Sequence, residues 1–178
     1  QDADILKYYS YWGDVHMNSL RRGNFDPSKA KNYNLLPLPV EVVRARAKRL
    51  KKLFKKHRLG TDLTVYRGIS SPEGLEHIQR QIGSDLYHPS AIGKTFTDKA
   101  FLSTSTSRRI ADESFGHHGM LVIKAKKGTN AIDMSNRVVS AVPDEQEILL
   151  PNNSRFRIVN VKTGKNGPEV EVERFAKG

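Results

Sequence analysis

Two carboxylates stand two residues apart, directly before an apolar run, in the stretch DEQEILLP at residues 144–151. Asp144, Glu145 and Glu147 place three acidic side chains within four residues, although the chain carries a formal net charge of +11. Like charges this close repel one another, and burial beside the apolar residues that follow adds to the cost of keeping them ionised. A solvated acidic turn does not explain that apolar run, so the pattern indicates a functional site.

Two further polar motifs occur upstream in strand-like contexts. Arg67 and Gly68 lie in VYRG, and Ser103, Thr104 and Ser105 lie in FLSTS. An arginine offers a planar, permanently charged fork that can grip phosphate oxygens, and a glycine lets a ligand approach the backbone closely. Hydroxyl groups on a strand can hold a carboxylate in place or bond to the neighbouring strands.

The order and contexts of Y-R-G, F-L-S-T-S and E-x-E-I-L-L resemble the R-S-E class of mono-ADP-ribosyltransferases, which includes many bacterial toxins and secreted effectors. The resemblance extends from Asp62 to about Val161, and the front segment is also similar, with Tyr9 and Tyr11 followed by Asn18. It implies an enzyme that transfers ADP-ribose from NAD to an acceptor and releases nicotinamide. NAD is then a co-substrate, and no metal is expected.

The resemblance also implies a role for each motif. Arg67 is expected to bind the NAD pyrophosphate, and the main chain at Gly68 is expected to hold the nicotinamide amide. Ser103 is expected to hold Glu147. That glutamate would bond the ribose 2′-hydroxyl and stabilise an oxocarbenium-like state as the glycosidic bond breaks. The remaining candidates, which would tie their strand to its neighbours or to the cofactor, are Thr104 and Ser105.

Glu145 points to one branch of this class. Residues two apart on a strand face the same side about 6.5 Å apart, so Glu145 would meet an acceptor beside the ribose held by Glu147. A guanidinium needs a carboxylate to orient it and to take its proton. E-x-E therefore resembles the arginine-modifying branch, whereas family members with glutamine at the first position modify other side chains or bases.

The loop SNRVVSAVPD, residues 135–144, is similar in position to the family's substrate-recognition turn. Its candidate contacts are Val138 and Val139. Many relatives that modify arginine in actin carry an aromatic residue there, and the absence of one here argues against actin as the target. Beyond the STS strand, Arg108 or Arg109 is either a phosphate contact or a solvated surface residue.

Several alternatives remain open at this point. The chain could be an NAD glycohydrolase with water as acceptor, an ADP-ribosyltransferase that acts on nucleic acid, or a basic RNA-binding module with coincidental motifs. We expect a monomer that is secreted or delivered into a target cell, acts in its cytoplasm and inserts into no membrane. Its expected partners are a target with a surface arginine and a cognate immunity or inhibitor protein.

The N-terminal third of the chain, residues 1–60, is expected to be helical. One helical pattern runs from Ile5 to Arg22 and stops at Gly23. A second starts at Pro39 and closes at Gly60; it holds nine Lys or Arg residues and no acid between positions 44 and 58. This basic helix 44–58 is expected either to expose a solvated face or to bind an acidic partner.

Residues 61–178 are expected to form a β-rich NAD-binding core, which completes a single catalytic domain spanning residues 1–178. Strand signals occur in DLTVYRG, KAFLSTSTS, MLVIKAKKGTNAIDM, QEILLP, RFRIVNVK and PEVEVERF, with short helices at SPEGLEHIQRQIG and 109–115. Helices followed by strands predict an α+β fold, with the N-terminal helices packed on a mixed, mainly antiparallel two-sheet core. The chain has no cysteine, which excludes disulfides and thiolate sites, and His117-His118 is expected to lie in a turn.

Overall fold

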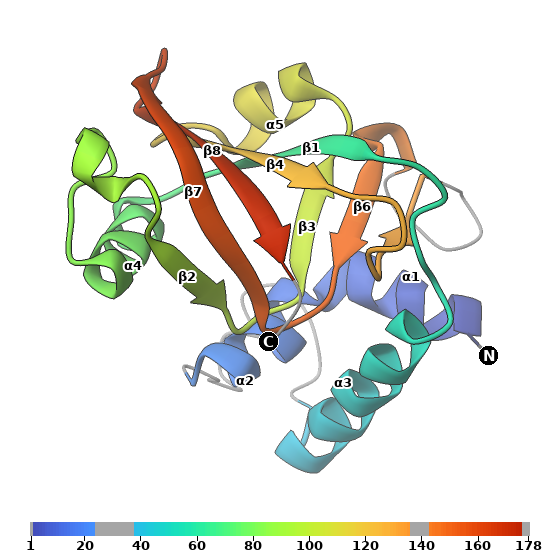
Figure 1. Ribbon diagram of the computed structural model, residues 1–178. Helices are drawn as coiled ribbons and strands as arrows, with labels where there is room; N and C mark the ends of the chain where they lie inside the picture. The colour runs from blue at the N-terminus through green and yellow to red at the C-terminus, as the bar shows by residue number, and fades with distance from the viewer. Residues whose placement is uncertain (1, 24–37, 136–142, 176–178) are drawn as a thin grey trace.

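The computed structural model describes residues 2–23, 38–135 and 143–175 of the chain (Figure 1). The helices are α1 (Asp2–Trp12), a π-helical turn (Asp14–Asn18), α2 (Ser19–Arg22), α3 (Val40–Phe54), α4 (Pro72–Ile82) and α5 (Arg108–Phe115), with 3₁₀ turns at Pro89–Ala91 and Pro143–Glu145. The strands are β1 (Leu63–Gly68), β2 (Thr95–Asp98), β3 (Leu102–Ser105), β4 (Met120–Ala125), β5 (Ile132–Asp133), β6 (Glu147–Leu150), β7 (Ser154–Thr163) and β8 (Pro168–Phe175).

The strands form one curved sheet in the order β2-β7-β8-β4-β1-β3-β6-β5. Its pairs are antiparallel except β4 with β8, which is parallel. β1 and β3 are joined at one register position, Tyr66 with Ser105, and β3 and β6 run steeply across the direction of β1 and β4 (Figure 1). The mixed, mainly antiparallel core is therefore confirmed, and the two expected sheets are two halves of one sheet that meet at this pair.

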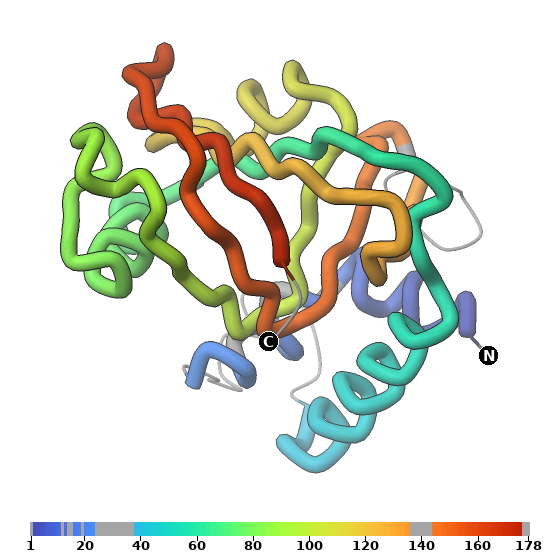
Figure 2. The backbone as a smooth tube through the Cα atoms, in the orientation of Figure 1, coloured from blue at the N-terminus to red at the C-terminus, as the bar shows by residue number. Residues whose placement is uncertain are grey.

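Two apolar clusters pack against the sheet, and the first of them includes strands of both halves. On one side α4 contributes Ile82 to a cluster that contains Ile123 of β4. On the other, α1 and α3 lie together beside the β3–β6–β5 half, as the tube in Figure 2 shows, and Leu50 packs in one cluster with Phe101 and Leu149. Burial of these apolar side chains holds the N-terminal helices against the sheet.

The N-terminal helical pattern is interrupted, although the sequence predicted one helix up to Arg22. Gly13 lies against the ring of Tyr9, and an added Cβ would overlap that ring. The amide of Asn18 donates to the carbonyl of Gly13 at 2.8 Å, a bond across five residues that is typical of a π turn. The turn brings the Asn18 side chain to the phenol of Tyr9, with Nδ2 and the phenol oxygen 2.9 Å apart.

The basic helix is confirmed as α3, but it ends at Phe54 rather than just before Gly60. Asn130 explains the early end, because its Nδ2 donates to the Phe54 carbonyl at 2.6 Å and satisfies a helix-terminal acceptor. The chain beyond then pairs with a distant segment through a bridge between Arg58 and Asn130. The apolar residues that predicted this helix are all buried: Val43, Ala47, Leu50 and Phe54.

Local signals placed α4 correctly and missed β2. Ser71 caps α4 by accepting from the Gly74 amide at 3.1 Å, and Gly83 ends it with a left-handed φ of 65°. β2 has only four residues, of which Phe96 alone is buried, so its sequence has no clear strand pattern. Pairing with β7 makes it a strand. No helix in the described ranges is both long and apolar enough to span a bilayer.

Candidate active site

Neighbouring strands bring together the three motifs that the sequence singled out. Ser105 of β3 pairs with Tyr66 of β1 on one side and with Glu147 of β6 on the other. Arg67 follows that pair on β1, and Ser103 precedes it on β3. The arginine, serine and glutamate motifs therefore occupy adjacent strands at the point where the two halves of the sheet meet.

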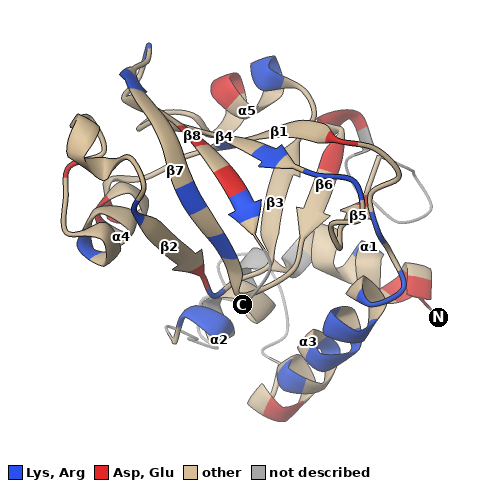
Figure 3. Ribbon diagram, in the orientation of Figure 1, with Lys and Arg blue, Asp and Glu red and all other residues tan. Residues whose placement is uncertain are grey.

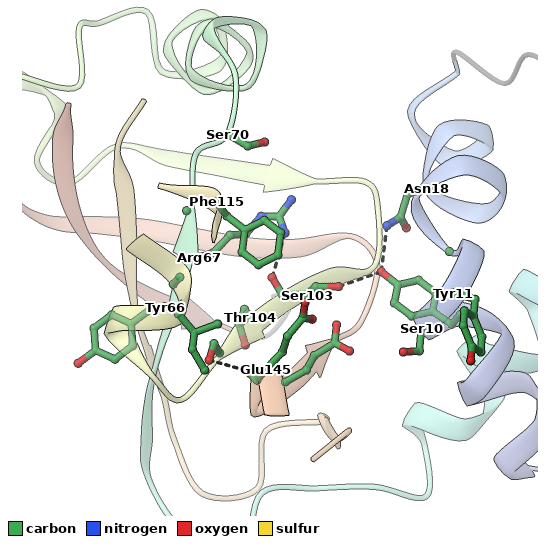
Figure 4. A pocket seen from close by; sticks show the side chains of 17 residues that line it. Ser10, Tyr11, Asn18, Tyr66, Arg67, Ser70, Ser103, Thr104, Phe115 and Glu145 are labelled. Atoms are coloured by element: carbon green, nitrogen blue, oxygen red, sulfur yellow. Dashed lines mark hydrogen bonds between the residues drawn. The ribbon is translucent and has the colours of Figure 1, made fainter. Parts of the chain in front are cut away.

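A pocket of about 270 Å³ opens at this point (Figure 4). Every candidate residue of the three motifs lines it: Arg67, Gly68, Ser103, Thr104, Ser105, Glu145 and Glu147. The other residues of the lining come from the front helices, from β1 and the residues after it, and from α5: Tyr9, Ser10, Tyr11, Gly13, Asn18, Tyr66, Ser70, Ile110, Ala111 and Phe115.

Glu147 is the buried acid of the pocket, with only 8% of its surface exposed. Burial raises the pKa of its carboxyl, and the charge of Glu145 raises it further. The hydrogen bond from Ser103 and the charge of Arg67 lower the pKa, but they do not reverse the shift. The pocket thus holds a poorly solvated carboxylate, whose charge is better satisfied by a cationic partner than by water.

Ser103 contacts several of the other groups at once. Its carbonyl oxygen accepts from Nη1 of Arg67 at 2.9 Å, and its hydroxyl oxygen lies 3.4 Å from the phenol oxygen of Tyr9. The same side chain also lowers the pKa of Glu147 by side-chain hydrogen bonding. One residue of β3 therefore holds Arg67 directly and influences the charge of Glu147.

Arg67 retains binding capacity after this contact. A guanidinium has five N–H groups, and the bond to Ser103 uses one nitrogen, so further donors remain for an anion in the pocket (Figure 4). Gly68, by contrast, is required by chain packing, since a Cβ there would overlap the backbone at Phe115 and Gly116. The sequence predicted that this glycine allows a ligand to approach the backbone, but on its Cβ side the neighbour is the end of α5.

Glu145 reaches the pocket by a route that differs from the predicted one. The prediction placed Glu145 and Glu147 on one face of a strand, but β6 begins at Glu147 and Glu145 ends a 3₁₀ turn. Gln146 between them has a φ of 50°, so the chain turns through a left-handed residue rather than through the pleat of a strand. Both carboxylates still line the same pocket, and burial raises the pKa of Glu145 as well.

The hydroxyls of the other two motif residues bond to the backbone across the strand pair. The hydroxyl of Thr104 donates to the carbonyl of Ile148 at 2.6 Å, and that of Ser105 donates to the carbonyl of Glu145 at 2.7 Å. Of the two roles left open for Thr104 and Ser105, these contacts correspond to tying β3 to its neighbour.

Tyr9 and Asn18 are pocket residues to which the sequence analysis gave no role. Burial raises the pKa of Tyr9 to about 12. Asn18 donates to its phenol and accepts from the amide of Phe101 at 3.0 Å, so the front helices are bonded to the start of β3. Gly13 lies inside a helical pattern, where glycine is unfavourable, so it was the sequence signal that this segment has a role beyond forming a helix.

Exposed aromatic rings also line the pocket. Tyr11 is 57% exposed and Phe115 43% exposed, and both belong to its lining. Solvent-exposed rings of this size offer flat apolar surfaces for a planar ligand. Nothing in the local sequence around Phe115 distinguishes it from a residue that packs at the end of a short helix.

The arginines after the STS strand are engaged in ion pairs. Both terminal nitrogens of Arg108 donate to the carboxylate of Glu169, which lowers the pKa of that carboxyl. Arg109 pairs with Glu113 one helical turn away, with 3.1 Å between Nη1 and Oε2. Neither arginine lines the pocket, so both are surface residues here.

The remaining predictions concern loops. His117 and His118 lie in a turn, as predicted. Across residues 2–23, 38–135 and 143–175, no group of three potential metal ligands lies together. Val138 and Val139, the candidate contacts in the substrate-recognition loop, fall outside the described residues.

A family model described as ADP-ribosyltransferase exoenzyme matches residues 9–175. A curated relative, an uncharacterized protein of Acanthamoeba polyphaga mimivirus, is 26% identical over 180 residues, which cover 96% of this chain and 21% of that protein. The chain thus spans about a fifth of the length of this relative.

Solved structures share the fold. C3stau2 from S. aureus with NAD aligns with a TM-score of 0.71 at 17% identity, covering 99% of this chain and 87% of that chain. A second structure is exoenzyme S from Pseudomonas aeruginosa, in complex with human 14-3-3 protein beta and bound to carba-NAD. It aligns with a TM-score of 0.64 at 19% identity, covering 97% of this chain and 72% of that chain. At these identities the likeness shows the fold, and it agrees with the α+β architecture described above.

Proposed function

The chain belongs to the ADP-ribosyltransferase exoenzyme family, and we propose that it transfers ADP-ribose from NAD to an arginine side chain of a target protein, releasing nicotinamide. One observation carries the arginine assignment. Two carboxylates, Glu145 and Glu147, line the same pocket as Arg67, so an acid is available for each of the two reacting partners.

The chemistry of the pocket fits NAD as co-substrate. Arg67 offers unused N–H donors to the pyrophosphate, and the exposed ring of Phe115 offers a surface for a planar base. The family resemblance adds the main chain at Gly68 as the contact for the nicotinamide amide. These contacts would place the nicotinamide ribose near Ser103 and Glu147.

Glu147 serves the donor. As the bond between ribose and nicotinamide breaks, nicotinamide leaves with the electron pair and positive charge develops on the ribose. A carboxylate held in a poorly solvated pocket stabilises that charge more strongly than one in water. The backbone of Glu147 is held in the β3–β6 ladder and by the Met134 amide, so little reorganisation is needed as the reaction proceeds.

Glu145 serves the acceptor. Its carboxylate would orient the incoming guanidinium, whose nitrogen forms the new bond to the ribose carbon that nicotinamide leaves. The guanidinium proton passes to Glu145 in the same step. Burial raises the pKa of Glu145, which makes the carboxylate a stronger base than an exposed glutamate. A residue of this kind is needed because a free arginine holds its proton tightly.

The basic surface of α3 is our candidate for contact with an acidic partner. Lys and Arg positions follow this helix along its length (Figure 3), and five of those within Val40–Phe54 have exposed side chains: Arg44, Lys48, Arg49, Lys51 and Lys52. The opposite face is buried against the sheet, so the helix presents its charge to solvent. Long-range attraction from such a surface raises the rate of encounter with an acidic partner.

We further propose a toxin or effector that is delivered to its target cell. Exoenzyme is the family's own description, and exoenzyme S forms a complex with a human protein. A chain of this kind would meet a protein target there, and a cognate inhibitor protein would protect the producing cell.

A two-product assay tests the proposal. The chain is incubated with NAD labelled in its adenosine half, with and without agmatine as a small guanidine, and nicotinamide release and agmatine labelling are measured together. We expect both products. Glu147→Gln should abolish them, whereas the control Glu113→Gln, at an exposed ion pair outside the pocket, should retain them. Nicotinamide release that labels neither agmatine nor protein would identify a glycohydrolase instead, and no release at all would reject an NAD enzyme.

A further inference from the structure

The link between the two pocket glutamates is a strained residue. Gln146 has a φ of 50°, a conformation that side chains other than glycine and asparagine rarely adopt. Such a residue persists only when the surrounding structure holds it. The direction of Glu145 depends on this turn, because the strand begins after it, at Glu147.

Thr106, the residue that directly follows the STS motif, holds the turn. The backbone amide of Thr106 donates to the carbonyl of Gln146 at 3.1 Å, and its hydroxyl donates to the Oε1 of Gln146, also at 3.1 Å. Ser105 adds a bond to the carbonyl of Glu145 and accepts one from the amide of Ser107, which caps α5. The strained turn is thus bonded, residue by residue, to the segment between β3 and α5.

Glu147 shares Ser105 with this network as its ladder partner, but it also has supports of its own. It belongs to the β3–β6 ladder, and its carbonyl accepts from the amide of Met134 at 2.8 Å. Loosening the turn at Gln146 therefore frees Glu145 before it disturbs Glu147. Thr106 and Gln146 themselves lie outside the lining of the pocket.

We propose that Thr106 and Gln146 are positioning residues that aim Glu145 at the acceptor and leave the donor step to Glu147. The inference rests on the proposed function, since it assumes that Glu145 serves the acceptor. We call the two hydrogen bonds between Thr106 and Gln146 the clamp. Loss of the clamp should lower transfer to a guanidine, while NAD hydrolysis and the KM for NAD stay near their original values.

Graded variants test the clamp. Thr106→Val keeps the shape and the amide but loses the hydroxyl, and we expect agmatine labelling to fall on the order of fivefold, the effect of one neutral hydrogen bond. Gln146→Gly tolerates the left-handed backbone but loses the side-chain bond, so it should resemble Thr106→Val. Gln146→Val keeps neither the bond nor the favoured backbone, and it should lose about tenfold or more.

Asn153 supplies a matched control. It has a φ of 58° in the turn between β6 and β7, remote from the pocket lining, so Asn153→Val introduces the same backbone strain without touching Glu145. We expect it to lower Tm and leave the ratio of transfer to hydrolysis unchanged. The proposal would be overturned if the ratio of transfer to hydrolysis were the same in the Gln146 variants as in Asn153→Val. It would also be overturned if transfer and hydrolysis fell in parallel in Thr106→Val.

A second readout stays informative if the acceptor is not arginine. Carboxyl NMR on glutamate labelled with ¹³C follows the titration of Glu145 directly. Release of the turn into solvent should lower the pKa of Glu145 from its raised value in Thr106→Val and Gln146→Gly. If the wild-type protein does not label agmatine, only the proposed acceptor is rejected. If the pKa of Glu145 is the same in both variants as in the wild type, the clamp is rejected.

Discussion

Replacing Glu145 with glutamine should separate the two halves of the reaction. Glutamine keeps the length and hydrogen-bonding capacity of the side chain and removes only its charge. Glu147, Ser103 and Arg67 keep the contacts that they make to one another, since none of these bonds involves the Glu145 carboxylate. The donor side of the pocket should therefore work while the acceptor side loses its base.

The size of the effect follows from what the Glu145 carboxylate is proposed to do. A hydrogen bond to a charged group contributes about 1.5–3 kcal/mol, which sets a lower limit of about tenfold on the loss of transfer. If Glu145 also takes the guanidinium proton, the loss rises to about 10²–10⁴-fold. Hydrolysis should change only a few-fold, because water is small and uncharged and needs no carboxylate to orient it.

The same variant should shift the pH dependence of hydrolysis. The negative charge of Glu145 is one cause of the raised pKa of Glu147, so removing it should lower that pKa. Because Glu147 must be ionised to stabilise the developing positive charge, the acid limb of the hydrolysis profile should move to lower pH in Glu145→Gln.

The assay follows nicotinamide release and agmatine labelling in parallel, on preparations with Tm values matched to wild type, between about pH 3 and pH 9, which brackets the ordinary glutamate pKa of about 4.3. Equal loss of both activities would refute the division of labour, because the two carboxylates would then act as one unit. Full agmatine labelling by Glu145→Gln would remove Glu145 from the mechanism.

Further predictions concern the donor site, the stability of the fold and the basic helix. Glu147→Gln should reduce both transfer and hydrolysis on the order of a hundredfold or more, and activity within a few-fold of wild type would contradict its role. Folding raises the pKa of Glu147, so its ionised form destabilises the fold above that pKa and this cost disappears as pH falls through it; the same variant should therefore raise Tm at pH 7 but not at pH 4. Arg67→Lys should weaken NAD binding by calorimetry although the charge is kept, because an ammonium cannot replace the bidentate fork, and an unchanged Kd would assign Arg67 a structural role. Reversing Lys51, Lys52 and Lys55 to glutamate should slow modification of the protein target and flatten its salt dependence, with NAD hydrolysis as the control; a collapse of hydrolysis with Tm intact would place α3 in the active site instead.

Much of the fold could be read from the sequence because its signals are local. The apolar period of α3, the Ser71 cap and Gly83 end of α4, and the strand patterns around Arg67 each involve residues within one element. The three motifs could also be assigned to one site from their order, because the family resemblance supplied the strand neighbours. In the structure, the register of β3 and β6 pairs Ser105 with Glu147 and so brings two of the motifs together.

The rest of the site depends on contacts between distant segments. Gln146 is left-handed, yet a glutamine carries no turn signal, and its partner Thr106 lies 40 residues away in the chain. The phenol of Tyr9 donates to the carbonyl of Phe101 across 92 residues. Asn130 ends α3 by a bond that spans 76 residues. Local periodicity contains none of this information, which explains why the route of Glu145, the pocket role of Tyr9 and the end of α3 were missed.

The identity of the acceptor atom tests the account most directly. The chain would be incubated with NAD and a cell lysate, the labelled protein isolated, and the modified peptide fragmented by electron-transfer mass spectrometry, which keeps ADP-ribose on its side chain. We predict that the ADP-ribose is carried by an arginine, that Glu145→Gln abolishes this labelling, and that nicotinamide release persists in that variant. ADP-ribose on a different side chain or on a nucleobase, formed equally well by Glu145→Gln, would contradict the account.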